Sequence, residues 1–333
     1  YEVMIKPIIG ILGGSGFVGS YLSNELIKHG YTVRILTRKR ENARHLWLLP
    51  HSEIRVIRDF TKEALSQGLC GCVAAVNLIG ILNEKWDNGK GFKAVHTDIA
   101  ENLLKACEHL NIPQLLQISA LNANKSDASH YLSSKKAAEA LLLATNSDKS
   151  SQIKNSKCAS STKVTIIRPS VIFGSRDSFT NRFHTLLKLA PPIFPLAMGH
   201  TRLQPIYVGD VVKTILKIIQ NPQARQEAFD IAGPEILTLK EIVEYIAKVA
   251  GYRTKILPLG EGLSSIQANI LQYCPGKPFS RDNLRSLKVE SICTDENGLS
   301  QLGIIPTSMD SIVPGYLAKN NSRLAYYKFR DRT

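Results

Sequence analysis

Short apolar runs alternate along this chain with segments whose apolar residues recur at helical spacing. The runs at 7–12, 32–36, 53–60, 73–80, 114–120, 163–169 and 226–233 predict strands. Helices are predicted between them, among them one that ends at Gly30 and a long one over 92–111 that stops before Pro113. Strands that alternate with helices predict an α/β fold, namely a doubly wound parallel Rossmann sheet of about seven strands.

Two segments interrupt this alternation. Residues 146–162 are polar and rich in serine, which predicts a flexible surface insertion. Residues 177–199 are helical in pattern and then rich in proline, and together with 234–333 they are predicted to form a smaller lobe that binds a substrate or partner. The Rossmann domain would then comprise 1–176 and 200–233, with ligands bound at the carboxyl ends of its strands.

A glycine cluster, "GGSGFVG", follows the first predicted strand and precedes the first predicted helix. Its spacing fits both G-x-G-x-x-G and G-x-x-G-x-x-G, the patterns of a loop that holds a dinucleotide pyrophosphate against a helix start near Phe17. A tight strand–helix turn without a ligand is the alternative. The residues predicted to contact the dinucleotide are Gly13, Gly14, Ser15, Gly16, Phe17, Val18 and Gly19.

The residues that follow the second predicted strand indicate which dinucleotide binds. A carboxylate about twenty residues beyond the glycine loop would hold the ribose of NAD, but this chain has Arg38, Lys39 and Arg40 there. Cations suit a 2′-phosphate, so NADP(H) is favoured over NAD(H), with a solvated basic loop as the alternative. Asp59 and Phe60 are expected to meet the adenine. The ribose and pyrophosphate are expected to pass beside Asn77, Leu78, Ile79 and Gly80.

A tyrosine and a lysine four residues apart, Tyr131 and Lys135, are predicted to share one face of a helix. An ammonium beside a phenol lowers the phenol pKa, so Tyr131 could exchange a proton with a substrate oxygen while Lys135 also holds the nicotinamide ribose. Ser119, after the fifth predicted strand, could polarise a substrate carbonyl. The alternative for Tyr131 is an interface tyrosine whose hydroxyl is hydrogen-bonded.

Composition narrows the functional class only slightly. The 333 residues carry a formal net charge of +14, which indicates anionic partners or merely solubility. The six cysteines are scattered, which is typical of a reduced protein, and no metal site is expected around Cys70 and Cys72. No apolar run is long enough to span a bilayer and no signal peptide is recognised, so a bacterial cytoplasmic location is expected, with peripheral binding at the inner face of the membrane as a variant.

The motifs "GGSGFVG", "NLIG", "ISA", "YLSSK", "IIRPSVIFG", "PIYVGDVV" and "FDIAGPEILT" together resemble the extended and atypical short-chain dehydrogenase/reductase superfamily. More narrowly, "RLQPIYVGDV" and "PFSRDNL" are similar to the nucleotide-binding accessory subunit of respiratory complex I and its bacterial homologues, which are described as nucleoside-diphosphate-sugar epimerases. This resemblance implies a bound NADP(H) on Gly13, Gly16, Gly19, Arg38 and Asp59. It also implies that Pro169 to Val171 lie near the nicotinamide.

The motifs and the resemblance allow two interpretations of function. The first is an NADP-dependent oxidoreductase or epimerase that acts on a nucleotide sugar or a quinone-pathway intermediate. The second is a non-catalytic nucleotide-binding subunit of a respiratory or ubiquinone-biosynthesis assembly, favoured because Ala120 follows Ser119 where active relatives carry Ser or Thr. In the second case the basic, aromatic segment 319–333 would contact an anionic membrane surface or a protein partner; a solvated tail is the alternative, and nucleic acid ranks last.

Overall fold

The structure is a computed structural model, and it describes residues 6–152, 162–189, 192–221, 227–273 and 279–318. The chain divides into two compact units. The first comprises Tyr1–Arg168 and Val211–Asp230, and the second comprises Pro169–Asp210 and Ile231–Thr333. The roles predicted for the two parts of the chain, nucleotide binding and substrate or partner binding, stay predictions.

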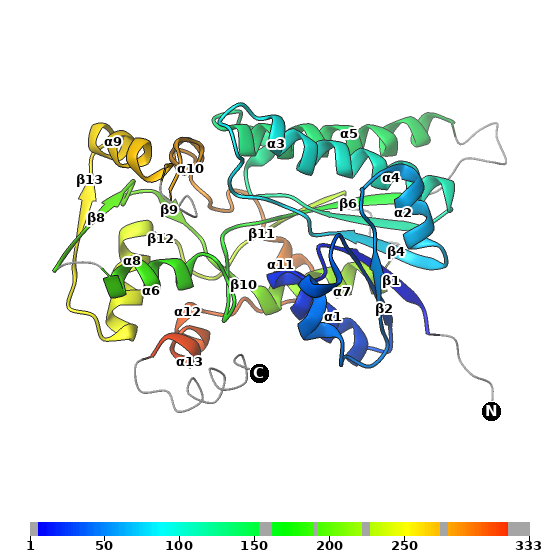
Figure 1. Cartoon of the computed structure of the whole chain (residues 1–333), viewed down its shortest axis with the longest axis horizontal. Coiled ribbons are helices and arrows are strands. Elements are labelled where there is room, and N and C mark those ends of the chain that lie inside the picture. The colour runs from blue at the N-terminus through cyan, green and yellow to red at the C-terminus, as the bar shows by residue number, and fades with distance from the viewer. Residues whose placement is uncertain (1–5, 153–161, 190–191, 222–226, 274–278, 319–333) are drawn as a thin grey trace. The chain divides into compact units, whose positions relative to one another are not determined.

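The first unit is built on a seven-stranded sheet with the order β11-β6-β5-β4-β1-β2-β3 (Figure 1). Its strands are β1 (Ile8–Leu12), β2 (Thr32–Thr37), β3 (Ser52–Val56), β4 (Cys72–Asn77), β5 (Gln114–Ile118), β6 (Lys163–Pro169) and β11 (Ala228–Ile231). The pairs from β3 to β6 are parallel. The predicted Rossmann fold is therefore confirmed, and each of the seven predicted strands overlaps a strand of this sheet.

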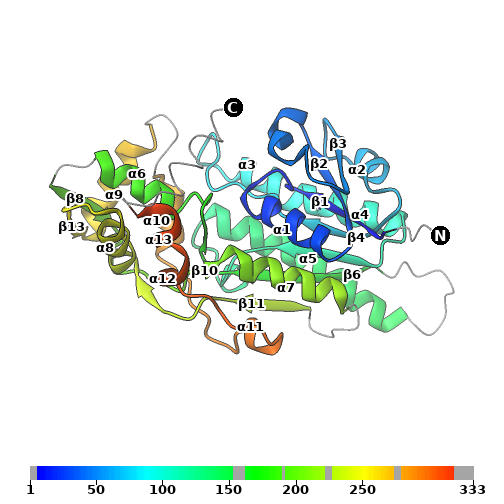
Figure 2. The ribbon, with the colours of Figure 1, turned by 90° about the horizontal axis from the view of Figure 1, so that it is seen from below.

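Helices cover both faces of this sheet. In Figure 1, α2, α4 and α5 lie on one face and α1 and α7 on the other, and the view from below in Figure 2 shows α1 and α7 in front of the strands. The helical segments of this unit are α1 (Phe17–Lys28), η1 (Arg40–Leu46), α2 (Lys62–Leu69), α3 (Lys90–Lys93), η2 (Ala94–Asp98), α4 (Ile99–His109), η3 (Ala123–Lys125), α5 (His130–Gln152) and α7 (Val208–Gln220).

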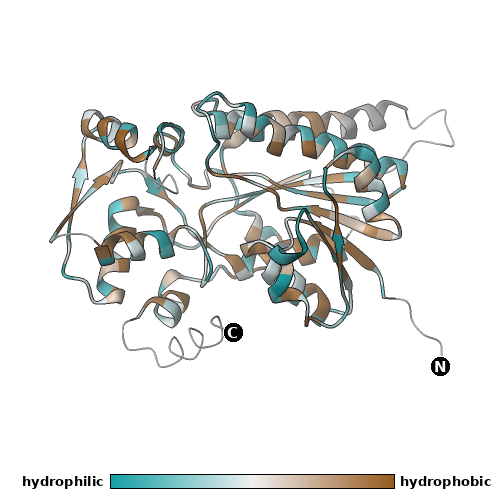
Figure 3. Ribbon diagram, in the orientation of Figure 1, coloured by the Kyte–Doolittle hydropathy of each residue, from teal (hydrophilic) through white to brown (hydrophobic). Residues whose placement is uncertain are grey.

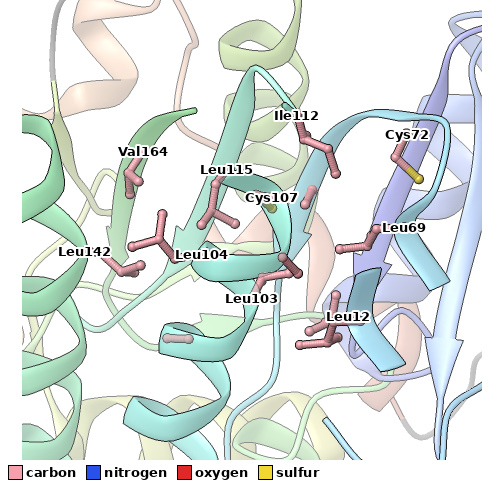
Figure 4. Close-up of a cluster of buried hydrophobic side chains, with 14 of the residues drawn as sticks. Leu12, Leu69, Cys72, Leu103, Leu104, Cys107, Ile112, Leu115, Leu142 and Val164 are labelled. Atoms are coloured by element: carbon pink, nitrogen blue, oxygen red, sulfur yellow. The ribbon is translucent and has the colours of Figure 1, made fainter. Parts of the chain in front are cut away.

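The apolar runs of the strands are explained by burial on two faces. Strands of a parallel sheet that is covered on both sides read as continuous apolar stretches rather than as alternating ones. One side of the core gathers Leu12, Leu115 and Val164 from strands with Leu69, Leu104 and Leu142 from α2, α4 and α5 (Figure 4). Figure 3 shows the same pattern, with hydrophobic strands between helices whose outer faces are more polar.

The predicted insertion at 146–162 differs from the structure in its first part. Helix α5 continues through Asn146 to Gln152, so these residues extend a regular helix. Once a helix is nucleated, each added residue contributes a hydrogen bond, so a polar segment can prolong it. Residues 153–161 lie outside the described residues, and Thr162, directly before β6, is buried.

The second unit contains three two-stranded sheets and several helices around its own core. Its strands are β7 (Ile172–Phe173) with β10 (Ile206–Tyr207), β9 (Arg202–Leu203) with β12 (Leu237–Thr238), and β8 (Ile193–Ala197) with β13 (Lys255–Leu259). Its helices are α6 (Thr180–Leu189), α8 (Leu239–Ala250), α9 (Glu261–Leu271), α10 (Arg281–Leu287), α11 (Gly298–Gln301), α12 (Met309–Ile312) and α13 (Pro314–Leu317). Phe173, Leu196, Ile242 and Val313 belong to its core.

Candidate active site

The glycine loop joins β1 to α1 and depends on close backbone contacts. Gly13 has φ +75°, in the left-handed region that favours glycine, and its carbonyl accepts the N–H of Gly16 at 3.0 Å. A Cβ on Gly19 would lie 2.5 Å from the carbonyl oxygen of Gly13, so α1 can pack on the loop only because Gly19 has no side chain. Gly14 is buried against Ile35. Gly13 therefore allows the tight turn of the loop, and Gly19 allows the close packing of α1 on it.

The start of α1 is open toward solvent. Its N-cap residue is Gly16, which is exposed and offers no side chain to the first N–H groups, and the first turn contains no acidic residue. A Cβ on Gly16 would meet only the carbonyl oxygen of Gly13, at 3.2 Å. Ser15, Phe17 and Val18 are half-buried around the same turn. Unpaired N–H groups and the helix dipole at such a start suit an anionic phosphate, so the residues present fit a dinucleotide pyrophosphate.

A second loop, Leu78 to Gly80, follows β4 and lies against the glycine loop. A Cβ on Gly13 would lie 3.1–3.3 Å from the backbone of Leu78 and Ile79, and the N–H of Leu78 donates to Leu12 at 3.0 Å. Asn77 is buried, and its amide donates to Gln117 and accepts from Ile79 N–H. The structure thus brings together two of the predicted dinucleotide segments at β1 and β4, where the order of the sheet reverses.

The cations predicted to meet a 2′-phosphate come directly after β2. Leu12 pairs with Leu36, so the loops after β1 and β2 leave the same edge of the sheet. Arg38 and Lys39 are exposed there, whereas the Arg40 and Arg44 guanidinium groups lie over the Trp47 ring, 5.3 and 5.9 Å from its centroid.

Asp59 and Phe60 lie in the loop between β3 and α2. Strand β3 ends at Val56, so the predicted strand extended too far, although Ile57 N–H still donates to Thr37. Asp59 is exposed, and the carbonyl of Phe60 accepts a hydrogen bond from Asn102 at 3.0 Å. Their contact with an adenine ring stays a prediction.

Tyr131 and Lys135 stand at the start of α5, as the sequence predicted. Lys135 is buried, and its Nζ donates to the carbonyl of Ile118 at 3.2 Å, at the carboxyl end of β5. Burial lowers the pKa of Lys135 to about 8, although the Glu139 carboxylate one turn along α5 acts in the opposite direction. Burial raises the pKa of Tyr131 to about 12. The prediction that Lys135 lowers the Tyr131 pKa was therefore wrong, because desolvation of the phenolate is the dominant effect.

Ser119 directly follows the carbonyl that Lys135 binds. Its N–H donates to Ile167 at 2.8 Å, and its Oγ is buried without a hydrogen-bond partner among the residues that the structure describes. A buried hydroxyl without a partner is costly unless a ligand or water satisfies it. This geometry is compatible with the predicted contact between Ser119 and a substrate oxygen, which stays a prediction.

A model described as the NAD dependent epimerase/dehydratase family matches residues 9–232. This chain belongs to that family. The predicted resemblance to extended short-chain dehydrogenases/reductases is thereby confirmed.

Curated members of this epimerase/dehydratase group include both subunits and enzymes. The chain is 27% identical over 309 residues to the mitochondrial NADH dehydrogenase [ubiquinone] 1 alpha subcomplex subunit 9 of Rattus norvegicus, covering 90% of this chain and 77% of that protein. It is 24% identical over 301 residues to an N-acetyl-alpha-D-glucosaminyl-diphospho-ditrans,octacis-undecaprenol 4-epimerase of Escherichia coli O157:H7, covering 85% and 84%.

Solved structures of this epimerase/dehydratase type share the fold. The UDP-N-acetylglucosamine 4-epimerase of Methanobrevibacter ruminantium M1 superposes with a TM-score of 0.69 at 17% identity, covering 98% of this chain and 100% of that one. DesIV, a dTDP-glucose 4,6-dehydratase of Streptomyces venezuelae solved with NAD and TYD bound, gives 0.70 at 15% identity, covering 98% of both chains.

Sequence reasoning missed several buried charges beside Lys135. Glu139 is buried, and Arg168 donates to its Oε2 from Nε and Nη2 at 2.9 and 2.7 Å and to Asp230 from Nη1 at 3.2 Å. The signal was available, because Glu139 follows Lys135 by one helical turn on the buried face of α5. These charges compensate one another in a region that excludes water.

The remaining predicted features have different outcomes. Pro169 ends β6 and the carbonyl of Val171 accepts from Ile206 N–H, but both residues belong to the second unit, so their place near a nicotinamide stays a prediction. The basic segment 319–333 lies outside the described residues.

In the part of the chain that is described, no group of three or more His, Cys, Asp or Glu could hold a metal ion. Among the described helices, none is both long enough and apolar enough to cross a membrane.

Proposed function

We propose that the first unit binds a nicotinamide dinucleotide, and that it does so to catalyse a redox or epimerisation step. The observation that carries this proposal is the contact between two loops at the reversal of the sheet: the glycine loop with its uncapped helix start, and the Asn77–Gly80 segment beside it. A pyrophosphate would occupy the open side of Gly16. Lys135 would hold the nicotinamide ribose.

NADP(H) is the proposed form of the dinucleotide. Arg38 and Lys39, two of the exposed cations after β2, would contact the 2′-phosphate, while the guanidinium groups of Arg40 and Arg44 lie over Trp47. Arg presents a planar fork of donors that matches a phosphate, so Arg38 is assigned the larger share of this preference.

The nicotinamide, when bound, accepts or gives up a hydride at a substrate carbon. Tyr131 would give a proton to the substrate oxygen as a carbonyl becomes a hydroxyl, or take it in the reverse direction, and Ser119 Oγ would donate a hydrogen bond to that oxygen. A pKa of about 12 keeps Tyr131 protonated at neutral pH, which suits the reductive direction. A nucleotide sugar or a quinone-pathway intermediate is the proposed substrate.

A nucleotide-binding subunit without turnover is the second candidate. It is supported by Ala120 next to Ser119 and by the similarity to a subunit named for NADH dehydrogenase. In that case the segment 319–333 would contact an anionic membrane surface or a protein partner, in a bacterial cytoplasm or at the inner face of its membrane.

The first experiment follows the nicotinamide fluorescence of the purified full-length chain in two forms. Quinones are added to the NADPH form, where hydride transfer to the quinone removes the signal, and UDP-sugars are added to the NADP⁺ form, where hydride transfer from a sugar hydroxyl creates it. Either change in the wild type, lost in Tyr131→Phe and kept in Tyr273→Phe on the exposed surface, would support the enzyme. Bound nucleotide that changes in neither form would support the subunit. A wild type that binds neither NADPH nor NADH would contradict both.

Cofactor choice is tested separately by titration with NADPH and NADH. Arg38→Ser is expected to weaken NADPH binding about 10- to 100-fold and to leave NADH binding nearly unchanged, because it removes only the contact to the 2′-phosphate. Arg253→Ser, an exposed arginine of the second unit, is the matched control. Equal losses for both nucleotides in Arg38→Ser would contradict the NADP(H) preference.

A further inference from the structure

The helix that follows the Asn77–Gly80 segment contains a wide turn beside the candidate site. Residues Ala94–Asp98 form a π-helix between α3 and α4, so the helix predicted over 92–111 is interrupted by one wider turn. A π turn joins residues five positions apart by hydrogen bonds and so widens the helix, and single π turns inside α-helices often occur at functional sites. The middle residue of this turn is His96, whose side chain is buried.

Both ring nitrogens of His96 are used, and each is directed at a different part of the site. Nε2 accepts the N–H of Ile81 at 3.1 Å, and Nδ1 lies 2.8 Å from Ser134 Oγ. Burial, together with the positive charge of Lys135, lowers the pKa of His96 to about 2, so the ring is neutral. A neutral ring that accepts at Nε2 carries its proton on Nδ1, so Nδ1 donates to Ser134, whose hydroxyl donates to the carbonyl of Tyr131 at 2.7 Å.

The same ring supports the Tyr131 side chain. The His96 and Tyr131 rings meet edge to face with centroids 5.5 Å apart, and Phe92 contacts both, stacked on His96 at 5.7 Å and edge-on to Tyr131 at 5.9 Å. A Cβ on Gly80 would lie 3.5 Å from Lys135 Nζ and 3.7 Å from His96 Nε2, so these two nitrogens lie beside the same backbone position. His96 therefore links the loop after β4 to the start of α5.

From these contacts we infer that His96 is a positioning residue, which fixes the Tyr131 phenol and the Gly80–Ile81 backbone relative to each other without touching the reacting atoms. This inference rests on the proposed redox function. Substitution of His96 should therefore affect kcat more than NADPH affinity. Loss of His96 misplaces the proton donor and so lowers kcat. NADPH affinity changes less, because the glycine loop and Arg38 do not depend on His96 and only the Gly80 end of the Asn77–Gly80 segment does.

The test compares four full-length chains for NADPH affinity, kcat and thermal stability. His96→Leu removes both hydrogen bonds, and His96→Gln can again accept from Ile81. Phe92→Leu removes a buried ring that contacts Tyr131 and cannot form hydrogen bonds. It is therefore the control for the loss of packing alone. We expect His96→Leu to lower kcat about 10- to 100-fold with an NADPH Kd within about threefold of the wild type. We expect His96→Gln to recover much of kcat, and Phe92→Leu to lower stability more than kcat.

The outcomes separate the two proposals. Turnover by the wild type with an unchanged kcat in His96→Leu overturns the positioning role alone, and so does an equal fall of kcat in Phe92→Leu. Failure of His96→Gln to recover kcat, although it is folded and binds NADPH, also overturns that role. A wild type that binds the nucleotide and changes it in neither form overturns the redox function and the positioning role together.

Discussion

Helices α1 and α8 have the same length, twelve residues, and begin in opposite ways. Helix α8, in the second unit, starts with a capping box in which Thr238 accepts from Glu241 N–H at 3.2 Å and the Glu241 carboxylate accepts from Thr238 N–H at 2.7 Å. Helix α1, in the first unit, starts at Gly16 with no side chain on its N–H groups. A start that is satisfied by its own sequence serves stability, whereas the open one leaves donors for a ligand.

The two units also treat charge differently. Each contains an arginine that gives two hydrogen bonds to one glutamate, but Arg168 and Glu139 are almost completely buried, while Arg202 and Glu290 are about half exposed. Of the second unit's described residues, the charged ones that are buried are carboxylates, and Asp177 and Asp210 accept hydrogen bonds from backbone N–H groups at turns. Among the described residues, the buried Lys and Arg side chains, Arg34, Lys135 and Arg168, belong to the first unit, and Lys135 lies in the candidate site.

The largest effect is expected where the buried pair of the first unit is broken. Arg168→Met leaves the Glu139 carboxylate buried without its partner, which costs about 3–5 kcal/mol of unfolding free energy. Arg202→Met removes the solvent-exposed counterpart and is expected to change stability very little. Urea denaturation of both variants measures this difference. Similar losses in the two variants would show that burial does not distinguish the pairs.

The next effect concerns the open helix start. Gly16→Asp places a good N-cap and a negative charge at α1, but its Cβ would lie 3.2 Å from the Gly13 carbonyl oxygen, so stability should stay within about 1 kcal/mol of the wild type. NADPH binding should weaken about 100-fold through repulsion of the pyrophosphate. Gly260→Asp makes the same change at the N-cap of α9, where nothing lies within 4 Å of the new Cβ. The control should show a similarly small change in stability and bind NADPH normally. Normal NADPH binding by Gly16→Asp would place the pyrophosphate elsewhere.

A pH-dependent effect is expected from the buried Lys135. Its pKa is about 8 in the folded chain against an ordinary 10.5, so between these values the unfolded chain binds the additional proton, and raising the pH across this window favours folding. The cost of the buried ammonium, about 3 kcal/mol, is fully present below pH 8. Lys135→Met should therefore be more stable than the wild type at pH 7, with the advantage shrinking toward pH 10.5.

Lys136→Met is the control for this experiment, because Lys136 lies on the same helix but is partly exposed beside Asp127. Chemical denaturation at several pH values between 7 and 10.5 provides the measurement. A stability difference between Lys135→Met and the wild type that does not change with pH would contradict a buried, charged Lys135.

The smallest effect is expected at the capped helix of the second unit. Thr238→Ala removes the hydroxyl that accepts from Glu241 N–H, which should lower the unfolding free energy by about 1 kcal/mol. NADPH affinity should stay that of the wild type, since this helix start serves only the fold. Weaker NADPH binding in this variant would contradict the idea that the start of α1 serves ligand binding and the start of α8 serves only stability.

The sequence predicted those parts of the structure in which a single pattern, such as an apolar run or a glycine spacing, determines the local structure. Continuous apolar runs located all seven strands of the first unit, and the glycine spacing located the loop and the start of α1 at Phe17. The strand ends were less accurate, because the apolar residues Ile57 and Phe60 prolong the apolar run in the sequence after β3 has ended at Val56. The second unit was predicted only as a lobe, since two-residue strands such as β9 and β12 are too short to leave a periodic signal.

Within the candidate site, spacing along one helix was informative and contacts between segments were not. Tyr131 and Lys135 could be paired from the sequence because they are four residues apart. The bonds from His96 to Ile81 and Ser134 join residues 15 and 38 positions apart, through a π turn that no propensity predicts. The predicted direction of the Tyr131 pKa shift was wrong because the shift depends on burial, and burial arises only when distant segments of the chain pack together.

The order of the strands has a consequence for synthesis of the chain on the ribosome. Strand β6 ends at Pro169, but β11, which pairs with its free side, begins only at Ala228. At roughly 5–20 residues per second, translation of residues 170–227 takes several seconds, during which the apolar edge of β6 has no neighbour from its own chain. An unpaired edge is a template for association with other chains. The yield of folded protein should therefore depend on translation speed and on chaperones. The finished sheet does not reveal this dependence, because β11 covers the edge of β6 in it.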